Sequence, residues 1–186
     1  MNLINHNLSR RFDYRWHTIH QIQRRQIPKH IRPWLTTQHS ITAKLRHIGE
    51  LSVDVIEDRW QAPSPRERTR LQLKPREMAR VRTVILRVND VPVVYARSII
   101  PARSIKGSWR YLPHLDNRPL GGYVYKAKAL RRSPTEITQL PAGLIENCDQ
   151  ALWARRSIFQ QYGPGILVNE AFYPAIADFT PLAGQL

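Results

Sequence analysis

Residues 81–100 read VRTVILRVNDVPVVYARSII, which is the clearest indication of fold in the chain. Two runs rich in β-branched residues, 81–88 and 91–100, flank the dipeptide Asn89-Asp90. Asn and Asp tolerate the positive φ angles that a tight two-residue turn requires. The stretch therefore predicts a β-hairpin, and Pro101 marks its end because proline cannot donate to a strand ladder.

A second hairpin is predicted near the end of the chain. Residues 152–160 and 166–173 flank the sequence Tyr162-Gly163-Pro164-Gly165, which is typical of a turn. Residues 51–55 alternate apolar and polar side chains, and 123–128 also reads as a strand. Because the hairpin connections are too short for parallel crossovers, we expect a single antiparallel sheet of about six strands.

Helices are predicted before the first strand. Ser40 is a suitable N-cap, and Ile41, Leu45 and Ile48 follow it on one helical face. A shorter helix over 31–35 is expected to precede it. Helices followed by strands in hairpins predict an α+β fold.

The chain has 186 residues, which suits one domain, and its 42% hydrophobic content excludes wholesale disorder. We predict a basic N-terminal segment over 1–26 and one domain over 27–186, in which 61–77 forms a polar connection or flap. No apolar run approaches the roughly 18 residues of a membrane span. The first residues lack an apolar stretch followed by a small-residue cleavage site, so we expect no secretory signal.

The net charge is +15, from 29 Lys and Arg against 14 Asp and Glu. This charge favours acidic partners and a weak attraction to an anionic membrane surface. It is spread along the chain without a zinc finger or an aromatic-rich RNA-binding motif, so we expect no nucleic-acid binding. Cys148 is the only cysteine and cannot form an internal disulfide, which fits the reducing cytoplasm.

Two charged residues stand at apolar positions of the predicted strands. Arg82 shares a strand face with Val84 and Leu86, and Glu170 shares one with Val168 and other apolar residues. A buried charge needs a partner or a ligand. One interpretation is structural: the two pair with each other, or they reach water at strand ends. The other is an anion-binding arginine and a proton-handling glutamate that face one cavity.

Other candidate sites are weaker. Arg156 lies on a strand face with Leu152, Ala154 and Ile158, which suits a structural cation better than a second pocket cation. His17-x-x-His20 has no further ligand nearby, and Gly163-Pro164-Gly165 lacks the strand-turn-helix context of a nucleotide loop. We therefore expect no metal, nucleotide or redox cofactor.

Beyond these features, an ordered set of short blocks resembles the bacterial chorismate pyruvate-lyases, enzymes that make 4-hydroxybenzoate for ubiquinone. The resemblance runs from about Ile27 to Pro174. It is carried by Trp34-Leu35, Ser40-Ile41-Thr42, Arg82, ARSIIP at 96–101, RPLG at 118–121, LWARRS at 152–157 and NEAFYP at 169–174.

The resemblance implies a small antiparallel sheet with helices packed over a buried ligand site. It implies that Arg82 and Glu170 act on chorismate, and that Ile41 and Leu120 join them in binding substrate or product. Ile41 stands where the family pattern has methionine. The implied activity is a cofactor-free elimination of pyruvate by a cytoplasmic enzyme, which we expect to be a monomer.

The alternative is a sensor domain of the same fold that binds an aromatic acid without catalysis. Such domains in bacterial transcription regulators are attached to a winged helix of some 60 or more residues. Because only 33 residues precede Trp34, without a helix-turn-helix pattern, the sequence favours the enzyme.

Overall fold

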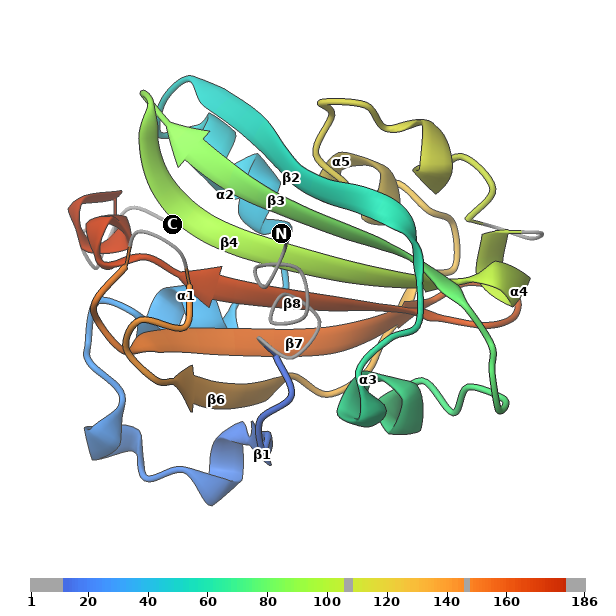
Figure 1. Cartoon of the computed structure of the whole chain (residues 1–186). Helices are drawn as coiled ribbons and strands as arrows, with labels where there is room; N and C mark the ends of the chain where they lie inside the picture. The colour runs from blue at the N-terminus through green and yellow to red at the C-terminus, as the bar shows by residue number, and fades with distance from the viewer. Residues whose placement is uncertain (1–11, 106–108, 146–147, 180–186) are drawn as a thin grey trace, which may run out of the picture.

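An antiparallel sheet in the order β1-β6-β7-β8-β4-β3-β2 forms the centre of the computed structural model, which describes residues 12–105, 109–145 and 148–179 (Figure 1). A further short strand, β5, pairs with β7. The strands are β1 (His17–Thr18), β2 (Leu51–Gln61), β3 (Ala79–Val88), β4 (Val91–Pro101), β5 (Arg131–Arg132), β6 (Glu136–Leu140), β7 (Leu152–Gln160) and β8 (Ile166–Phe172). The predicted α+β fold with one antiparallel sheet is confirmed.

Both predicted hairpins are present. In the first, Val88 pairs with Val91, and Asn89 and Asp90 have φ angles of 48° and 64°. These left-handed conformations give the turn a twist that matches the twist of the two strands. In the second, β7 and β8 pair from Phe159 and Ile166 onward. The two hairpins meet where β4 pairs with β8, which completes the middle of the sheet.

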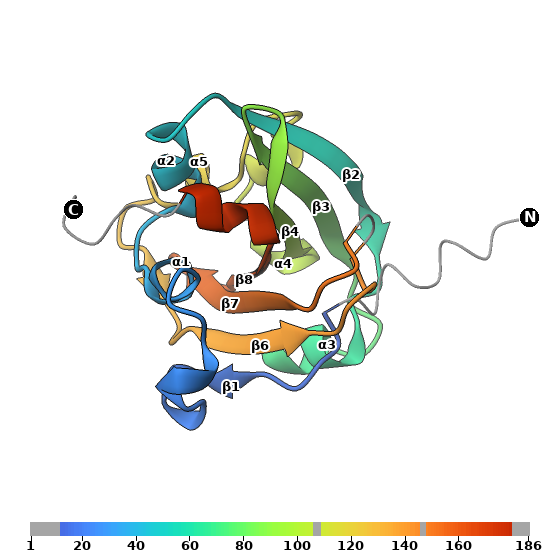
Figure 2. The ribbon, with the colours of Figure 1, turned by 90° about the vertical axis from the view of Figure 1, so that its left-hand side faces the viewer.

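The sheet curves around several short helices, which lie on its concave side (Figure 2). These are α1 (Arg32–Thr36), α2 (Ile41–Arg46) and α5 (Gly121–Val124), whereas α3 (Pro65–Arg70) lies against the opposite, convex face. The remaining helical turns are α4 (Ala102–Ile105) and the 3₁₀ turns η2 (Ile19–Gln21), η3 (Arg24–Gln26), η4 (Leu112–His114) and η5 (Pro174–Phe179).

The two helices predicted before the first strand are present as α1 and α2, and they pack over the concave core. Ser40 caps α2, because its side-chain oxygen accepts a hydrogen bond from the backbone N–H of Ala43 at 3.2 Å. Trp34, Leu35 and Leu45 are all buried against the sheet. Local capping and the burial of one apolar face together fix these short helices, which would be marginal in isolation.

Three segments differ from the sequence prediction. Residues 61–77 contain α3, which begins with a reciprocal capping box between Ser64 and Glu67. Residues 123–128, predicted as a strand, instead form the end of α5 and a turn. Strand β2 continues to Gln61 through an irregularity between Val55 and Glu57, which changes the face on which its later side chains lie.

The N-terminal boundary also lies earlier than the sequence blocks suggest. Phe12 is fully buried against Tyr95, and β1 at His17–Thr18 pairs with β6. The Asp13 carboxylate accepts a hydrogen bond from the backbone N–H of Arg66 at 3.0 Å. Residues 12–26 therefore pack on the sheet of the domain predicted to begin at residue 27.

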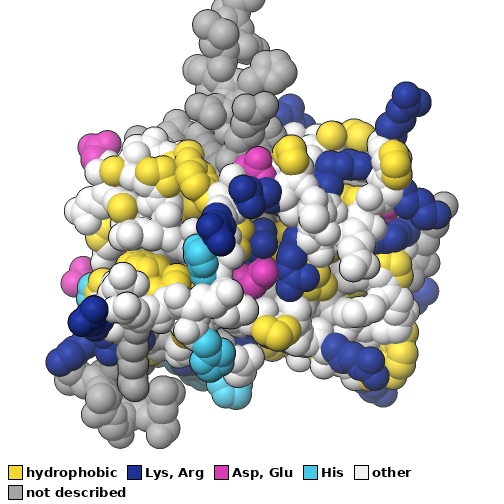
Figure 3. Space-filling view, turned by 90° about the horizontal axis from the view of Figure 1, so that it is seen from below, with side chains coloured by type: hydrophobic (Ala, Val, Ile, Leu, Met, Phe, Trp, Pro, Cys, Tyr) yellow, Lys and Arg dark blue, Asp and Glu magenta, His cyan; other side chains and the backbone are white. Residues whose placement is uncertain are grey.

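Basic side chains occupy several separate places on the face seen in Figure 3, with acidic side chains near the central ones. This view agrees with the dispersed charge of the sequence. No helix among the described residues has the length and apolar character of a membrane span.

A buried ion cluster holds α3 on the convex face. The Arg97 guanidinium donates from Nε to Glu67 at 2.9 Å and from Nη1 to Glu57 at 3.3 Å. Arg97 and Glu67 are at most 1% exposed. Each charge thus depends on the other, since an unpaired charge at this depth is strongly destabilising.

We predict that Glu67→Ala lowers the free energy of unfolding by about 3 kcal/mol, because it leaves Arg97 short of a buried partner. Denaturant unfolding measures the loss, and Glu50→Ala, at an exposed position, is the control. A loss below about 1 kcal/mol, the range of surface pairs, would contradict a structural role for the cluster.

Candidate functional site

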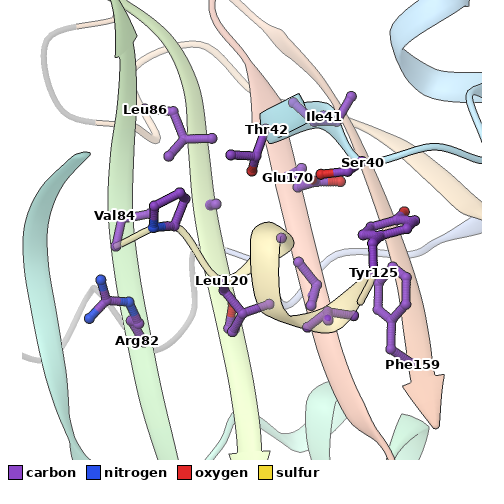
Figure 4. Close-up of a pocket in the computed structure, with 16 residues that line it drawn as sticks. Ser40, Ile41, Thr42, Arg82, Val84, Leu86, Leu120, Tyr125, Phe159 and Glu170 are labelled. Carbon is purple, nitrogen blue, oxygen red and sulfur yellow. The ribbon is translucent and has the colours of Figure 1, made fainter. Parts of the chain in front are cut away.

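A pocket lies between the concave face of the sheet and the helices α2 and α5 (Figure 4). The space that protein atoms leave unfilled here, with the open solvent at its mouth included, is about 570 Å³. Its walls are mainly apolar and are formed by Val84, Leu86, Ala96, Pro119, Val124, Phe159 and Val168. Polar groups join them at a few places, which is typical of a site for a small organic ligand.

All four candidate site residues line this one pocket: Ile41, Arg82, Leu120 and Glu170. Arg82 comes from β3, Glu170 from β8, Ile41 from the start of α2, and Leu120 from the residue before α5. In the view of Figure 4, Arg82 lies toward one end of the pocket and Glu170 toward the other. Their roles toward a ligand stay predictions.

Arg82 is held rigidly at its end of the pocket. Its Nη1 donates to the Asp58 carboxylate at 2.8 Å, and its Nη2 donates to the backbone carbonyls of Asp116 and Arg118. Asp58 also accepts from Arg80 at 2.6 Å, so two cations share one carboxylate. The cluster keeps a net positive charge, which suits an anionic group in the pocket.

Glu170 has a different partner, Arg155 on β7. The Arg155 guanidinium donates from Nε to Glu170 at 2.6 Å and from Nη1 to the carbonyls of Trp34 and Thr37. The direct Arg82–Glu170 ion pair, one of the structural interpretations, is therefore wrong. Both residues line one pocket and each has its own ion-pair partner, which is compatible with the cavity interpretation.

Two helix starts supply the remaining candidates. Ile41 is the first residue of α2, where backbone N–H groups lack an acceptor within the helix. Leu120 directly precedes α5, whose first residue, Gly121, approaches α2 closely. A Cβ at Gly121 would lie 2.7 Å from Thr42 Oγ1 and 3.0 Å from Ser40 Oγ. Only glycine therefore permits this contact between the two helices.

Arg156, the other arginine of the pair on β7, lies on the convex side. Its Nε donates to Glu136 at 2.8 Å, and its guanidinium stacks over the Trp16 ring. The structural interpretation of Arg156 is confirmed. Burial lowers the pKa of its guanidinium, and the Glu136 carboxylate opposes that shift.

Sequence reasoning missed two polar residues of the site. The sequence does not indicate a role for Arg155, because both faces of β7 carry apolar residues and alternation alone does not identify the pocket side. Tyr125 was placed in a strand, although it caps the C-terminus of α5 and lines the pocket. Burial raises the pKa of the Tyr125 hydroxyl, Glu170 adds to this, and Arg132 and Arg155 act in the opposite direction.

Among the described residues, no three His, Cys, Asp or Glu side chains come together as metal ligands. His17 and His20 lie in β1 and η2 on the outer part of the sheet, away from the pocket residues. Cys148 is buried in the convex core, where its Sγ contacts the carbonyl of Gln150.

Comparison of sequences gives a family match over most of the chain. The family model described as "Chorismate lyase" matches residues 13–180. A relative from Aromatoleum aromaticum, named "Probable chorismate pyruvate-lyase", is 36% identical over 83% of this chain and 90% of its own length. One with the same name from Hydrogenovibrio crunogenus is 33% identical over 89% and 94%.

Solved structures show similarity of fold. A GntR-family transcriptional regulator from Bacillus cereus matches 74% of this chain and 99% of its own, with a TM-score of 0.53 and 10% identity. The PhnF C-terminal domain matches 75% and 93%, with a TM-score of 0.53 and 16% identity. At these identities the likeness concerns the arrangement of strands and helices alone.

We predict that Gly121→Ala destabilises the protein by about 1–3 kcal/mol, because the new methyl group collides with Thr42 and Ser40. Gly122→Ala is the matched control on the same helix, since its Cβ would meet only Arg46 Nη1, at 3.9 Å. We expect this control to be neutral or slightly stabilising. Equal unfolding free energies for the two variants would show that the α2–α5 contact is not tight.

Proposed function

Because the chain belongs to the chorismate lyase family, a family of carbon–oxygen lyases, we propose that it eliminates pyruvate from chorismate to give 4-hydroxybenzoate. In this proposal the enzyme supplies 4-hydroxybenzoate for ubiquinone biosynthesis. Its ligands are chorismate and the product, and it acts without a cofactor. The observation that carries the proposal is that Arg82 and Glu170 line one pocket with mainly apolar walls.

In this proposal Arg82 binds the ring carboxylate. Its hydrogen bonds to described residues use three of its five N–H donors, so donors remain for a ligand. The positive balance of the Arg80–Arg82–Asp58 cluster supports binding of an anion. The apolar walls exclude water and strengthen the attraction between guanidinium and carboxylate.

Glu170 binds the opposite end of the ring. Its ion pair with Arg155 keeps a carboxylate oxygen in place, and that carboxylate accepts a hydrogen bond from the ring hydroxyl that the product retains. In this proposal the backbone N–H of Ile41 donates to the same hydroxyl oxygen, a contact that does not depend on the Ile41 side chain. Leu120 contributes its backbone, next to the Gly121 contact.

The reaction needs little more than orientation. The bond between the ring carbon and the ether oxygen breaks, and its electron pair leaves with that oxygen on the enolpyruvyl group. The neighbouring ring carbon loses its hydrogen as a proton, and the electrons of that C–H bond complete the aromatic ring. Enolpyruvate then gains a proton on its methylene carbon and becomes pyruvate. Aromatisation supplies much of the driving force, so the pocket acts by holding the ring between two fixed charges.

The direct test is incubation of the purified protein with chorismate alone. We expect 4-hydroxybenzoate, followed by its absorbance, and pyruvate, followed by a coupled assay, to appear in equal amounts. A chelator should leave the rate unchanged. Absence of both products from folded protein would overturn the proposed function, and a chelator-sensitive rate would overturn its cofactor-free form.

We predict distinct defects when the two pocket charges are removed. Arg82→Ala should raise KM and weaken product binding at least about tenfold, because the carboxylate loses its buried cation. Glu170→Gln should lower kcat by about 10²-fold or more, because it removes one of the two fixed charges that orient the ring. Steady-state kinetics and calorimetric binding of 4-hydroxybenzoate measure both.

The controls are Arg80→Lys, which keeps a cation beside Asp58, and Glu136→Gln, which changes a glutamate paired with arginines on the other face of the sheet. Both should leave KM and kcat close to those of the unmodified protein. Near-normal turnover by folded Glu170→Gln would remove Glu170 from the reaction. Unaltered product binding by Arg82→Ala would place the carboxylate elsewhere.

A further inference from the structure

One polar atom of the pocket has no use in the site described so far. The hydroxyl of Tyr125 is buried and has no hydrogen-bond partner among the described residues. Burying a hydroxyl without a partner destabilises a protein. Yet the residue lines the ligand pocket, where a bound molecule can supply the missing partner.

The Tyr125 ring is held in a defined orientation. It packs edge-on against Phe159, with ring centroids 5.4 Å apart and an interplanar angle of 65°. Phe159 is itself buried, and the Arg132 guanidinium lies over its ring, 5.3 Å from the centroid. The backbone N–H of Tyr125 is fixed by the carbonyl of Gly121 at the end of α5. The hydroxyl is therefore preorganised.

The charged side chains that act on this hydroxyl are two arginines and one glutamate, so their balance is positive. Arg155 and Arg132 both act electrostatically on Tyr125, and the two guanidinium groups donate to the same carbonyl, that of Thr37. Glu170 is the acid that faces the group, and it is already paired with Arg155. In Figure 4, Tyr125 and Glu170 lie away from the Arg82 end of the pocket. A second anionic group of a ligand is thus better placed here than beside the apolar walls.

Chorismate and its product differ at this end. Both carry the ring carboxylate and the ring hydroxyl, but only chorismate carries the enolpyruvyl ether, with a second carboxylate and an oxygen that gains negative charge as the bond breaks. Arg82 and Glu170 account for the groups that the two molecules share. A donor for the leaving group remains to be assigned.

We propose that the Tyr125 hydroxyl donates a hydrogen bond to the enolpyruvyl group of chorismate and stabilises it as the ether bond breaks. This inference rests on the proposed function. The hydroxyl keeps its own proton: the ether oxygen takes the electron pair of the broken bond, and Tyr125 and the nearby guanidinium groups stabilise the charge that develops there. A buried hydroxyl without a partner among the described residues lowers stability, and a bound substrate would offset that loss.

Tyr125→Phe tests the proposal, since it removes one oxygen and keeps the ring against Phe159. We expect the single-turnover rate of pyruvate formation to fall by about 10²-fold, as for loss of one donor to a developing oxyanion. The dissociation constant of 4-hydroxybenzoate should stay within about twofold, because the product lacks the leaving group. The melting temperature without ligand should be unchanged or higher, because no buried donor is left unpaired.

Tyr123→Phe is the matched control: it lies on the same helix, is 37% exposed and does not line the pocket. It should alter none of the three measurements. An unchanged rate in Tyr125→Phe would overturn the inference. Equal losses of rate and product affinity would also overturn it, because they would assign the hydroxyl to the part of the ring that substrate and product share. A lower melting temperature together with both losses would overturn it as well, because the hydroxyl would then have a structural role. The proposed function fails separately, if the unmodified protein releases no pyruvate.

Discussion

The ion pair between Arg155 and Glu170 is the interaction on which the site depends. Arg155 is 1% exposed, and its guanidinium joins β7 to β8 through Glu170 and to the α1–α2 connection through the carbonyls of Trp34 and Thr37. A guanidinium at this depth is tolerated only when its donors find acceptors. The hydrogen bonds that the Arg155 guanidinium donates therefore fix the end of α1. The end of α1 in turn sets the start of α2 and one end of the pocket. Loss of this arginine would leave Glu170 without its charge partner and the helix connection without its anchor.

The curved sheet separates two sets of charges. On the convex face, the ion pairs of Arg97 with Glu57 and Glu67 attach α3 to the sheet. None of these three residues lines the pocket. On the concave face, the clusters around Arg82 and Glu170 open to a cavity with apolar walls. The same kind of pair thus stabilises packing where a helix covers it and remains available to a ligand where a pocket lies above it. Solved regulator domains have a similar arrangement of strands and helices, so the fold alone does not determine an activity.

Prediction from sequence succeeded where the signal is local. Asn89 and Asp90 adopt the turn that their tolerance of positive φ indicates, and Ser40 caps the helix that follows it. Alternation also placed Arg82 and Glu170 on the correct strand faces. It failed at α5, where the apolar and aromatic residues after Gly121 read as a strand. The helical turn observed there packs closely against Thr42, and that contact joins positions about 80 residues apart. Alternation also did not show which of Arg155 and Arg156 lies on the pocket side, because β7 has buried residues on both of its faces.

By itself, the sequence determined the antiparallel hairpins, the Ser40 helix cap, the strand faces of Arg82 and Glu170 and, through its ordered blocks, the family. These properties depend on neighbours within a few residues, or on the period of two along a strand. The tertiary structure decided the partner of each buried charge: Asp58 for Arg82, and Arg155 for Glu170. It also decided that Tyr125 ends in the pocket with its hydroxyl unpaired. A partner for a buried charge comes from whatever segment the fold brings within about 3 Å, as when Arg155 reaches the carbonyl of Trp34, 121 residues away. No local pattern in the sequence carries that information.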